Sequence, residues 1–238
     1  MSKTINTKLI KLVKYYNLIN HTLIFNNKSI NRYKKNKLNN SYSKSEDLKI
    51  LKTKIEEIKN CKLKENASKL VFSDGNQNAK IMIIGEGPGA NEDKEGLPFV
   101  GRAGQLLDKM LNAINLNRNN VYITNVVNYR PPENRKPTDK EISTYLPYLK
   151  KHIEIIKPKV ILLLGSTAMN AILKNEDVIS NVRGKWFQID MNNSKINLIV
   201  SFHPAYLLRQ PDQKKFSWID LKMIRDKIRN LKIKIEKY

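Results

Sequence analysis

Four short apolar runs, separated by stretches with helical spacing, constrain the fold of this 238-residue chain most strongly. The apolar runs cover residues 81–84, 121–127, 160–164 and 196–202. The helical stretches cover residues 104–114, 139–156, 167–174 and 213–232. Strands that alternate with helices form a mainly parallel sheet with helices on both faces. The sequence therefore predicts an α/β fold, a three-layer α/β/α sandwich with a central four-stranded parallel sheet.

The N-terminal region differs in composition from the rest of the chain. Residues 1–45 contain ten Lys or Arg and no Asp or Glu, and residues 8–19 have the pattern of a short amphipathic helix. A basic segment without acids also resembles a transit peptide, but Arg32 is its only arginine. We predict a basic extension over residues 1–45, partly disordered or forming an accessory helix, followed by one α/β domain over residues 46–238.

The charge of the chain favours an acidic partner. Lys and Arg number 44 against 22 Asp and Glu, so the formal net charge is +22. Such an excess favours nucleic acid first and an anionic membrane second, although a lysine-rich coding bias explains part of it. No uncharged apolar run approaches the roughly 18–20 residues of a membrane span. The single cysteine, Cys61, excludes a disulfide scaffold and a metal site built from several thiolates.

A glycine-rich loop follows the first apolar run. Six of the nine glycines lie between residues 85 and 104, and Glu86 stands between two of them. Neither the P-loop spacing nor the dinucleotide-binding glycine spacing is present. A tight strand-to-helix turn explains one or two of these glycines, but not an acid among them followed by Phe99. We interpret the loop as part of a ligand site.

Polar residues also follow the other apolar runs. Asn125 lies at the end of the second run, residues 165–166 follow the third, and His203 follows the fourth. Ligands of open α/β sheets bind beyond the carboxyl ends of the parallel strands. These residues are therefore expected to meet at one edge of the sheet.

Three stretches of the chain together resemble the three motifs of the family 4 uracil-DNA glycosylases. They read GEGPGANEDKEGLPFVGRAGQLLDKML, YITNVVNYRPPENRKPT and SFHPAYLLRQPDQKK, and the similarity extends over about residues 48–231. The resemblance implies a central four-stranded parallel sheet, as the pattern of the chain also does. It further implies removal of uracil from DNA by cleavage of the N-glycosidic bond, the first step of base-excision repair.

Uracil recognition is expected to use residues from all three motifs. A flipped base needs an aromatic face, and the resemblance gives this role to Phe99, which is otherwise an ordinary core residue. The Asn125 amide can accept from uracil N3–H and donate to O4, a pattern that cytosine opposes. Its alternative role is a strand-end cap. The backbone of Gly85, Glu86 and Gly87 is expected to hold the O2 side.

His203 and Glu86 are the predicted catalytic residues. Departing uracil carries negative charge on O2, which a hydrogen bond from His203 would stabilise. Glu86 is the first candidate for orienting water and balancing the cationic sugar. Glu92 is the second candidate, or it shapes the pocket near uracil C5. The other histidines, His21 and His152, are expected at the surface.

The loop after His203 is expected to contact DNA. Apolar side chains can fill the space that a flipped base leaves. The predicted DNA-binding residues are Arg102, Tyr206, Leu207, Leu208 and Arg209, with core packing as the alternative for the two leucines. Further phosphate contacts are expected from Arg130, Arg135, Lys214 and Lys215.

The chain departs from the family at its iron–sulfur cluster. Most family 4 enzymes hold a [4Fe–4S] cluster with four cysteines, and the corresponding positions here are Ile58, Cys61, Tyr129 and Tyr145. A cubane normally needs four thiolates. We therefore predict that the cluster is absent and that no metal or organic cofactor is used.

The resulting hypothesis is a monomeric, cytoplasmic, nucleoid-associated enzyme that acts on uracil-containing DNA and does not bind membranes. Three alternatives stay open from the sequence. They are a glycosylase for another deaminated base or one that forms a covalent DNA adduct, a non-catalytic DNA-binding remnant, and an unrelated mononucleotide-binding protein.

Overall fold

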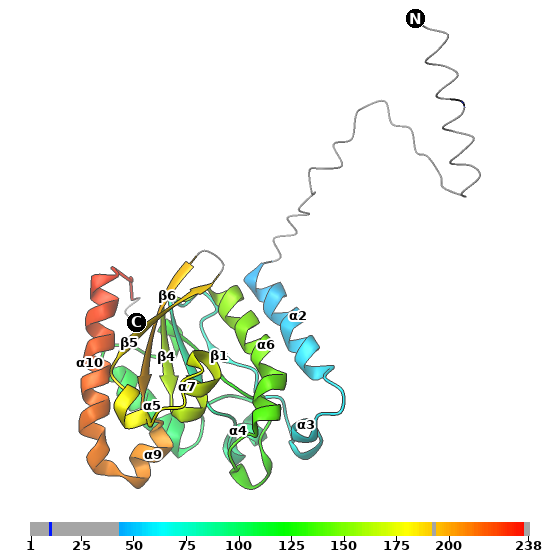
Figure 1. Ribbon diagram of the computed structural model, residues 1–238, viewed down its shortest axis with the longest axis horizontal. Coiled ribbons are helices and arrows are strands. Elements are labelled where there is room, and N and C mark those ends of the chain that lie inside the picture. Colours follow the sequence, from blue (N-terminus) through cyan, green and yellow to red (C-terminus); the bar gives the residue numbers. More distant parts are fainter. Residues whose placement is uncertain (1–9, 11–42, 192–193, 236–238) are drawn as a thin grey trace, which may run out of the picture. The chain divides into compact units, whose positions relative to one another are not determined.

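The sheet lies at the centre of the described part of the chain. The computed structural model describes Ile10, residues 43–191 and residues 194–235. Within these residues a six-stranded sheet has the order β1-β3-β2-β4-β6-β5. Figure 1 shows the sheet between α10 (Lys214–Asn230) on one side and α6 (Asp139–Ile156) on the other. The strands are β1 (Asp74–Gly75), β2 (Ile81–Gly85), β3 (Val121–Asn125), β4 (Val160–Leu164), β5 (Trp186–Met191) and β6 (Ser194–Ser201).

The four predicted strands form the parallel centre of this sheet. β2 pairs in parallel with β3 on one side and with β4 on the other, and β4 pairs in parallel with β6. The predicted fold class is thus confirmed, and the sheet is extended by two edge strands that were not predicted. β1 and β5 are antiparallel to their neighbours. Neither forms a buried apolar run, because β1 has two residues and β5 has no fully buried one.

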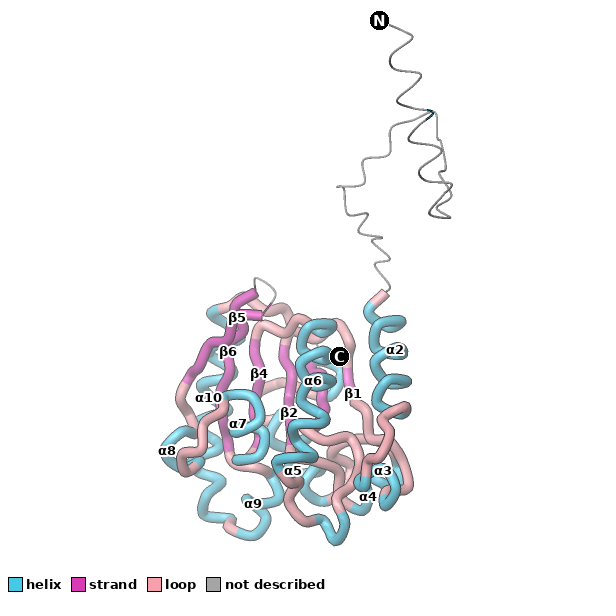
Figure 2. The backbone as a smooth tube through the Cα atoms, turned by 45° about the vertical axis from the view of Figure 1, so that its right-hand side comes forward, coloured by secondary structure: helices cyan, strands magenta, loops and turns pink. Residues whose placement is uncertain are grey.

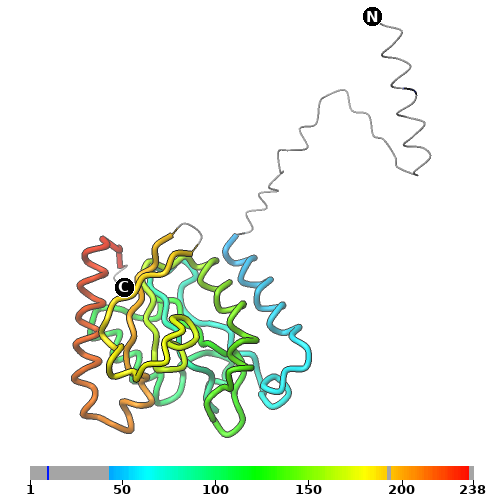
Figure 3. Tube along the Cα trace, in the orientation of Figure 1, coloured from blue at the N-terminus to red at the C-terminus, as the bar shows by residue number. Residues whose placement is uncertain are grey.

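Helices cover both faces of the sheet. One face packs against α2 (Lys44–Glu56), α3 (Lys62–Asn66), α6 (Asp139–Ile156) and α7 (Ser166–Leu173). The other packs against α5 (Arg102–Asn112), α9 (Pro204–Arg209) and α10 (Lys214–Asn230). Figure 2 shows the strands edge to edge between these layers, and Figure 3 follows the chain from α2 on one side to α10 on the other.

The alternation of side chains in the central strand produces the two cores. Met82 and Ile84 of β2 join the core under α6, whereas Ile81 and Ile83 join the core under α5 and α10. All four side chains are at most 1% exposed, as a strand buried on both faces requires. The remaining short helices, α4 (Ala90–Glu95) and α8 (Ile179–Val182), follow the glycine-rich loop and α7.

The predicted boundary near residue 45 lies beside the start of α2. Ser43 caps this helix in a capping box with Glu46, a pattern that stabilises a helix by about 1 kcal/mol. The described residues from Ser43 onward belong to one compact unit. The predicted N-terminal extension and His21 lie outside the described residues, apart from Ile10 and residues 43–45. No helix in the described ranges has the length and hydropathy needed to cross a membrane.

Candidate functional site

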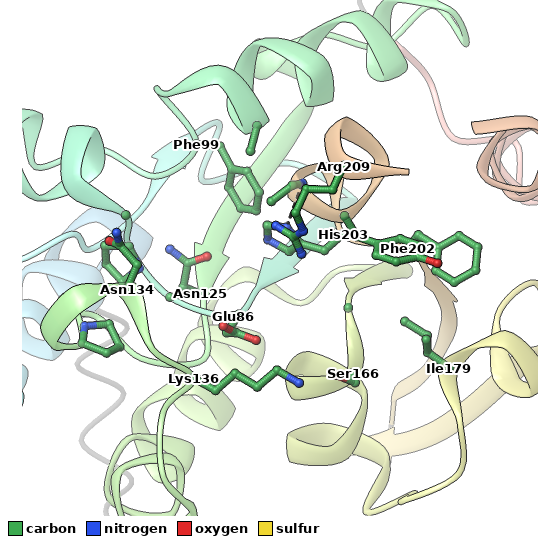
Figure 4. A pocket seen from close by; sticks show the side chains of 18 of the residues that line it. Glu86, Phe99, Asn125, Asn134, Lys136, Ser166, Ile179, Phe202, His203 and Arg209 are labelled. Carbon is green, nitrogen blue, oxygen red and sulfur yellow. Dashed lines mark hydrogen bonds between the residues drawn. The ribbon is translucent and has the colours of Figure 1, made fainter. Parts of the chain in front are cut away.

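A cavity of about 750 Å³ opens where the four parallel strands end. Its walls include Glu86 after β2, Asn125 at the end of β3, Ser166 after β4 and His203 after β6. Figure 4 shows Phe99, Asn125 and His203 turned toward one common space, with Glu86 beside them. The residues that sequence analysis expected at this edge of the sheet are therefore together.

Asn125 presents an unsatisfied acceptor to this cavity. Its side chain is 3% exposed, and its Oδ1 has no hydrogen-bond partner among the described residues. A buried acceptor without a partner costs roughly 1–3 kcal/mol, so Oδ1 is prepared for a donor from a ligand. A Cβ atom at Gly85 would lie 2.4 Å from this oxygen and 2.5 Å from Cζ of Phe99. The glycine thus allows both side chains to approach the strand end.

Phe99 is held in an uncommon backbone conformation. Its φ is +56° and its side chain is 5% exposed. The left-handed region costs a residue with a Cβ about 1–2 kcal/mol, and such strain persists only where the surroundings fix it. The Phe99 ring faces the His203 ring with centroids 5.6 Å apart and planes 28° from parallel.

Both carboxylate oxygens of Glu92 accept backbone hydrogen bonds. The donors are the N–H groups of Gly89 at 3.1 Å and of Val100 and Gly101 at 2.9 Å. Gly89 and Gly101 precede the first turns of α4 and α5, so Glu92 joins the starts of two helices. It also lines the cavity, which agrees with a shaping role better than with water activation.

The Glu86 carboxylate accepts fewer hydrogen bonds from the protein than the Glu92 carboxylate does. Among the described residues, the hydroxyl of Thr167 in α7 makes the one hydrogen bond to its carboxylate, at Oε2. This contact joins residues 81 positions apart in sequence, and no local pattern predicts it. The geometry therefore favours Glu86 over Glu92 as the acid that faces a reacting group.

His203 is the N-cap of α9, and this position fixes its protonation. The Ala205 N–H donates to Nδ1 of His203 at 3.2 Å. The ring proton of the neutral imidazole consequently lies on Nε2. Burial and, to a smaller extent, the nearby charge of Arg209 lower the pKa of His203 to about 4, although Glu92 opposes the shift. The site thus holds a neutral imidazole that donates a hydrogen bond at neutral pH.

The two leucines after His203 have different positions. Leu207 is 1% exposed and belongs to the core under α5 and α10, whereas Leu208 is 37% exposed. Neighbouring residues of a helix point about 100° apart, so one leucine is directed inward and the other outward. This corrects the DNA-binding expectation for Leu207. Tyr206 and Arg209 line the cavity, and Arg102 is exposed at the first position of α5.

His152 is wrongly expected at the surface. It is 1% exposed, and its Nδ1 lies 3.0 Å from the hydroxyl oxygen of Tyr122. Burial lowers its pKa to about 3. His152 is thus a neutral core residue of α6. The cavity is also lined by Val178, Ile179 and Ser180, which no motif of the sequence indicates.

The residues at the four cluster positions do not fit an iron–sulfur cubane. Cys61 offers the one thiol, and its Sγ lies 3.1 Å from the hydroxyl oxygen of Tyr145. Tyr145 is 1% exposed and packs edge-on against Tyr129, with ring centroids 6.5 Å apart. Ile58 and Cys61 pack against the same core. No metal-binding group of His, Cys, Asp or Glu was found within the described ranges.

Residues 72–226 match the family model described as the uracil DNA glycosylase superfamily. The chain is 41% identical over 186 residues to a type-4 uracil-DNA glycosylase of Sulfurisphaera tokodaii, covering 76% of this chain and 84% of the relative. It is 43% identical over 169 residues to one of Thermotoga maritima, covering 71% and 86%. A third, of Saccharolobus solfataricus, is 36% identical over 198 residues, covering 81% and 92%.

Proposed function

Because this chain belongs to the type-4 uracil-DNA glycosylases, we propose that it flips uracil out of DNA and hydrolyses the N-glycosidic bond in the cavity described above. Such an enzyme is a DNA N-glycosylase, a hydrolase that acts in DNA repair. The observation that carries the assignment of the site is the buried, unpartnered Oδ1 of Asn125 beside the neutral imidazole of His203. Uracil offers the complementary N3–H donor and O2 acceptor.

Base recognition in this proposal uses three groups. The Asn125 amide accepts from uracil N3–H through Oδ1 and donates to O4 through its NH₂ group. The Phe99 ring gives the base a face on which to stack, and the backbone of Gly85, Glu86 and Gly87 lies along the O2 side. Cytosine would place an acceptor against Oδ1 and a donor against the NH₂ group, so the same amide disfavours it.

Bond cleavage leaves negative charge on uracil and positive charge on the sugar. His203 donates from Nε2 to uracil O2, where the negative charge develops, and this neutral donor needs no proton transfer to act. Glu86 orients the attacking water and balances the sugar cation, with Thr167 holding one carboxylate oxygen. Gly87 has no side chain that could act as an acid or base, and Glu92 shapes the wall near C5.

Contacts with DNA surround the mouth of the cavity. Leu208 is the exposed apolar side chain that enters the space left by the flipped base. Tyr206 and Arg209 lie beside it, and Arg102 contacts phosphate from the start of α5. The Arg135 guanidinium is already paired with the Glu141 carboxylate, so its contribution to phosphate binding is expected to be smaller.

An excision assay tests the proposal directly. Purified protein is incubated with a labelled oligonucleotide that carries one uracil, and abasic sites are then cleaved with alkali. We expect strand cleavage at the uracil and none in a matched oligonucleotide with thymine there. Binding without cleavage would contradict the proposal and favour an altered base or a non-catalytic role.

The pH dependence of excision reports on the protonation state of the His203 imidazole. His203 must be neutral to accept from Ala205 and donate from Nε2, and its pKa is about 4. We expect kcat/KM to stay flat between about pH 5.5 and 7.5, where an ordinary histidine titrates, and to fall only as His203 gains a proton near pH 4. A rate that declines on acidification through about pH 6.5 would show an unshifted histidine.

We further propose that this enzyme works without an iron–sulfur cluster or another cofactor. The two tyrosines pack against each other where the family supplies thiolates, and one thiol cannot hold a cubane. The hydrogen bond between Cys61 and Tyr145 joins α6 to the segment after α2, and the edge-on tyrosine pair packs α6 against the loop after β3.

Iron analysis tests this second proposal. We expect purified protein to contain far less than one iron per chain and excision to be unaffected by chelator. A four-cysteine relative, purified in parallel, is the positive control for iron retention. Stoichiometric iron in this chain would contradict the proposal.

The Tyr145→Phe variant should retain activity. It should lose about 1 kcal/mol of unfolding free energy, because the hydrogen bond between the Tyr145 hydroxyl and Cys61 is removed.

We propose that the protein is a monomer. We also propose a cytoplasmic, nucleoid-associated location, where an enzyme that acts on DNA meets its substrate. Size-exclusion chromatography with light scattering tests the first of these statements.

A further inference from the structure

Arg118 lies outside the cavity but contacts the loop that carries Phe99. It opens the short 3₁₀ turn η1 (Arg118–Asn120) just before β3, and its side chain is 26% exposed. Its Nη1 donates to the Pro98 carbonyl at 3.2 Å, and its Nη2 donates to the Phe99 carbonyl. One guanidinium thus binds two consecutive carbonyls at the residue with φ of +56°.

Two carboxylates orient this guanidinium. Nε of Arg118 lies 2.9 Å from Oδ1 of Asp108, and Nη1 lies 2.5 Å from Oδ2 of Asp74. Burial disfavours the charge, but the hydrogen bonds that Arg118 donates to both carboxylates outweigh that effect and raise the pKa of Arg118 above its ordinary value. The planar fork of arginine suits this fixed arrangement, which a lysine cannot reproduce.

The Phe99 carbonyl has little freedom on its other side. A Cβ atom on Gly104 would lie 1.7 Å from this oxygen, so α5 approaches the carbonyl through a glycine. The following N–H groups, of Val100 and Gly101, donate to Glu92. The strained residue is therefore held between a cation that binds its carbonyl and an anion that binds the next two amides.

We propose that Arg118 is a positioning residue for base stacking, which holds Phe99 in its left-handed conformation so that the ring faces the flipped uracil. This inference rests on the proposed function. It adds that the orientation of the stacking ring depends on an ion-pair network on the outer side of the loop, through Asp74 and Asp108. Loss of this network should release the loop and cost catalysis without removing any cavity side chain.

A double-mutant cycle tests the proposal. In the wild-type background, we expect Arg118→Ala to lower the single-turnover excision rate on the order of 10-fold, the scale of one base–aromatic stack. In the Phe99→Ala background the same change should have less than about a twofold effect, because no ring is left to position. Arg118→Lys should restore little of the lost excision rate, because an ammonium group cannot reproduce the planar fork of the guanidinium. Equal fold losses in both backgrounds would overturn the proposal.

A measurement without turnover separates this inference from the proposed function. Hydrogen exchange of the segment 97–101 should quicken in Arg118→Ala, whether or not uracil is the substrate. Asp108→Asn serves as a milder variant if Arg118→Ala does not fold, with the same expected dependence on Phe99. Arg225→Ala, which breaks an exposed pair with Asp226, is the control and should change neither readout. Unchanged exchange at 97–101 would refute the positioning role, whereas an inactive wild-type enzyme would refute the function.

Discussion

His203→Ala is expected to lower kcat for uracil release on the order of 10²–10³-fold and to leave KM for DNA nearly unchanged. The donor on Nε2 acts where negative charge develops on O2, so its removal affects the transition state more than the bound substrate. The low pKa of His203, about 4, keeps this donor neutral and in place before the reaction begins. Single-turnover excision from a uracil oligonucleotide measures the effect.

The same substitution also removes a helix cap, so a matched variant is needed. His203 accepts from the Ala205 N–H at the start of α9, and such a cap is worth about 1 kcal/mol. His203→Asn restores an N-cap acceptor on a shorter side chain. We expect Asn and Ala variants to lose similar activity although the Asn variant unfolds at a higher temperature. An Asn variant with near wild-type kcat would show that the imidazole serves mainly as a cap.

The parallel centre of the fold could be predicted because its signal is local. Residues 160–164 are apolar at every position, and β4 is buried at every position. Thr138 precedes a first turn with Glu141, and α6 begins where that capping box indicates. The edge strands could not be found in this way, because β5 keeps every side chain at least partly exposed. Their place depends on pairing with β6 and not on composition.

Site residues were predictable where a motif carried them and not where a distant contact did. The cavity brings Glu86, Phe99 and Asn125 together as expected. Arg118 and Thr167 reach this site across 19 and 81 positions of sequence, so neither has a local signal. His152 is different, because it lies three residues after Leu149 and four before Ile156 on the buried face of α6. This helical spacing by itself indicates a core position for His152, so the expectation of a surface histidine was avoidable.

Asn125→Ala is expected to lower kcat/KM for uracil on the order of 10³-fold and to narrow the preference for uracil over cytosine. The wild-type amide is buried, with Oδ1 unpartnered until a donor arrives. Removing it costs two hydrogen bonds to uracil but also removes the repulsion that cytosine meets. The decisive readout is therefore the ratio of the two excision rates, and not the loss on uracil alone.

Asn125→Asp and Asn128→Ala separate base reading from loss of a buried amide. The Asp variant keeps the size of the side chain but replaces the donor toward O4 with a carboxylate oxygen, so we expect it to lose uracil excision at least as severely. Asn128 is also 3% exposed, but its Nδ2 donates to the Val71 carbonyl at 3.0 Å, outside the cavity. Asn128→Ala should lower the unfolding temperature and leave the uracil-to-cytosine ratio unchanged. An Asn125→Ala enzyme that kept the wild-type ratio would place base selection elsewhere in the cavity.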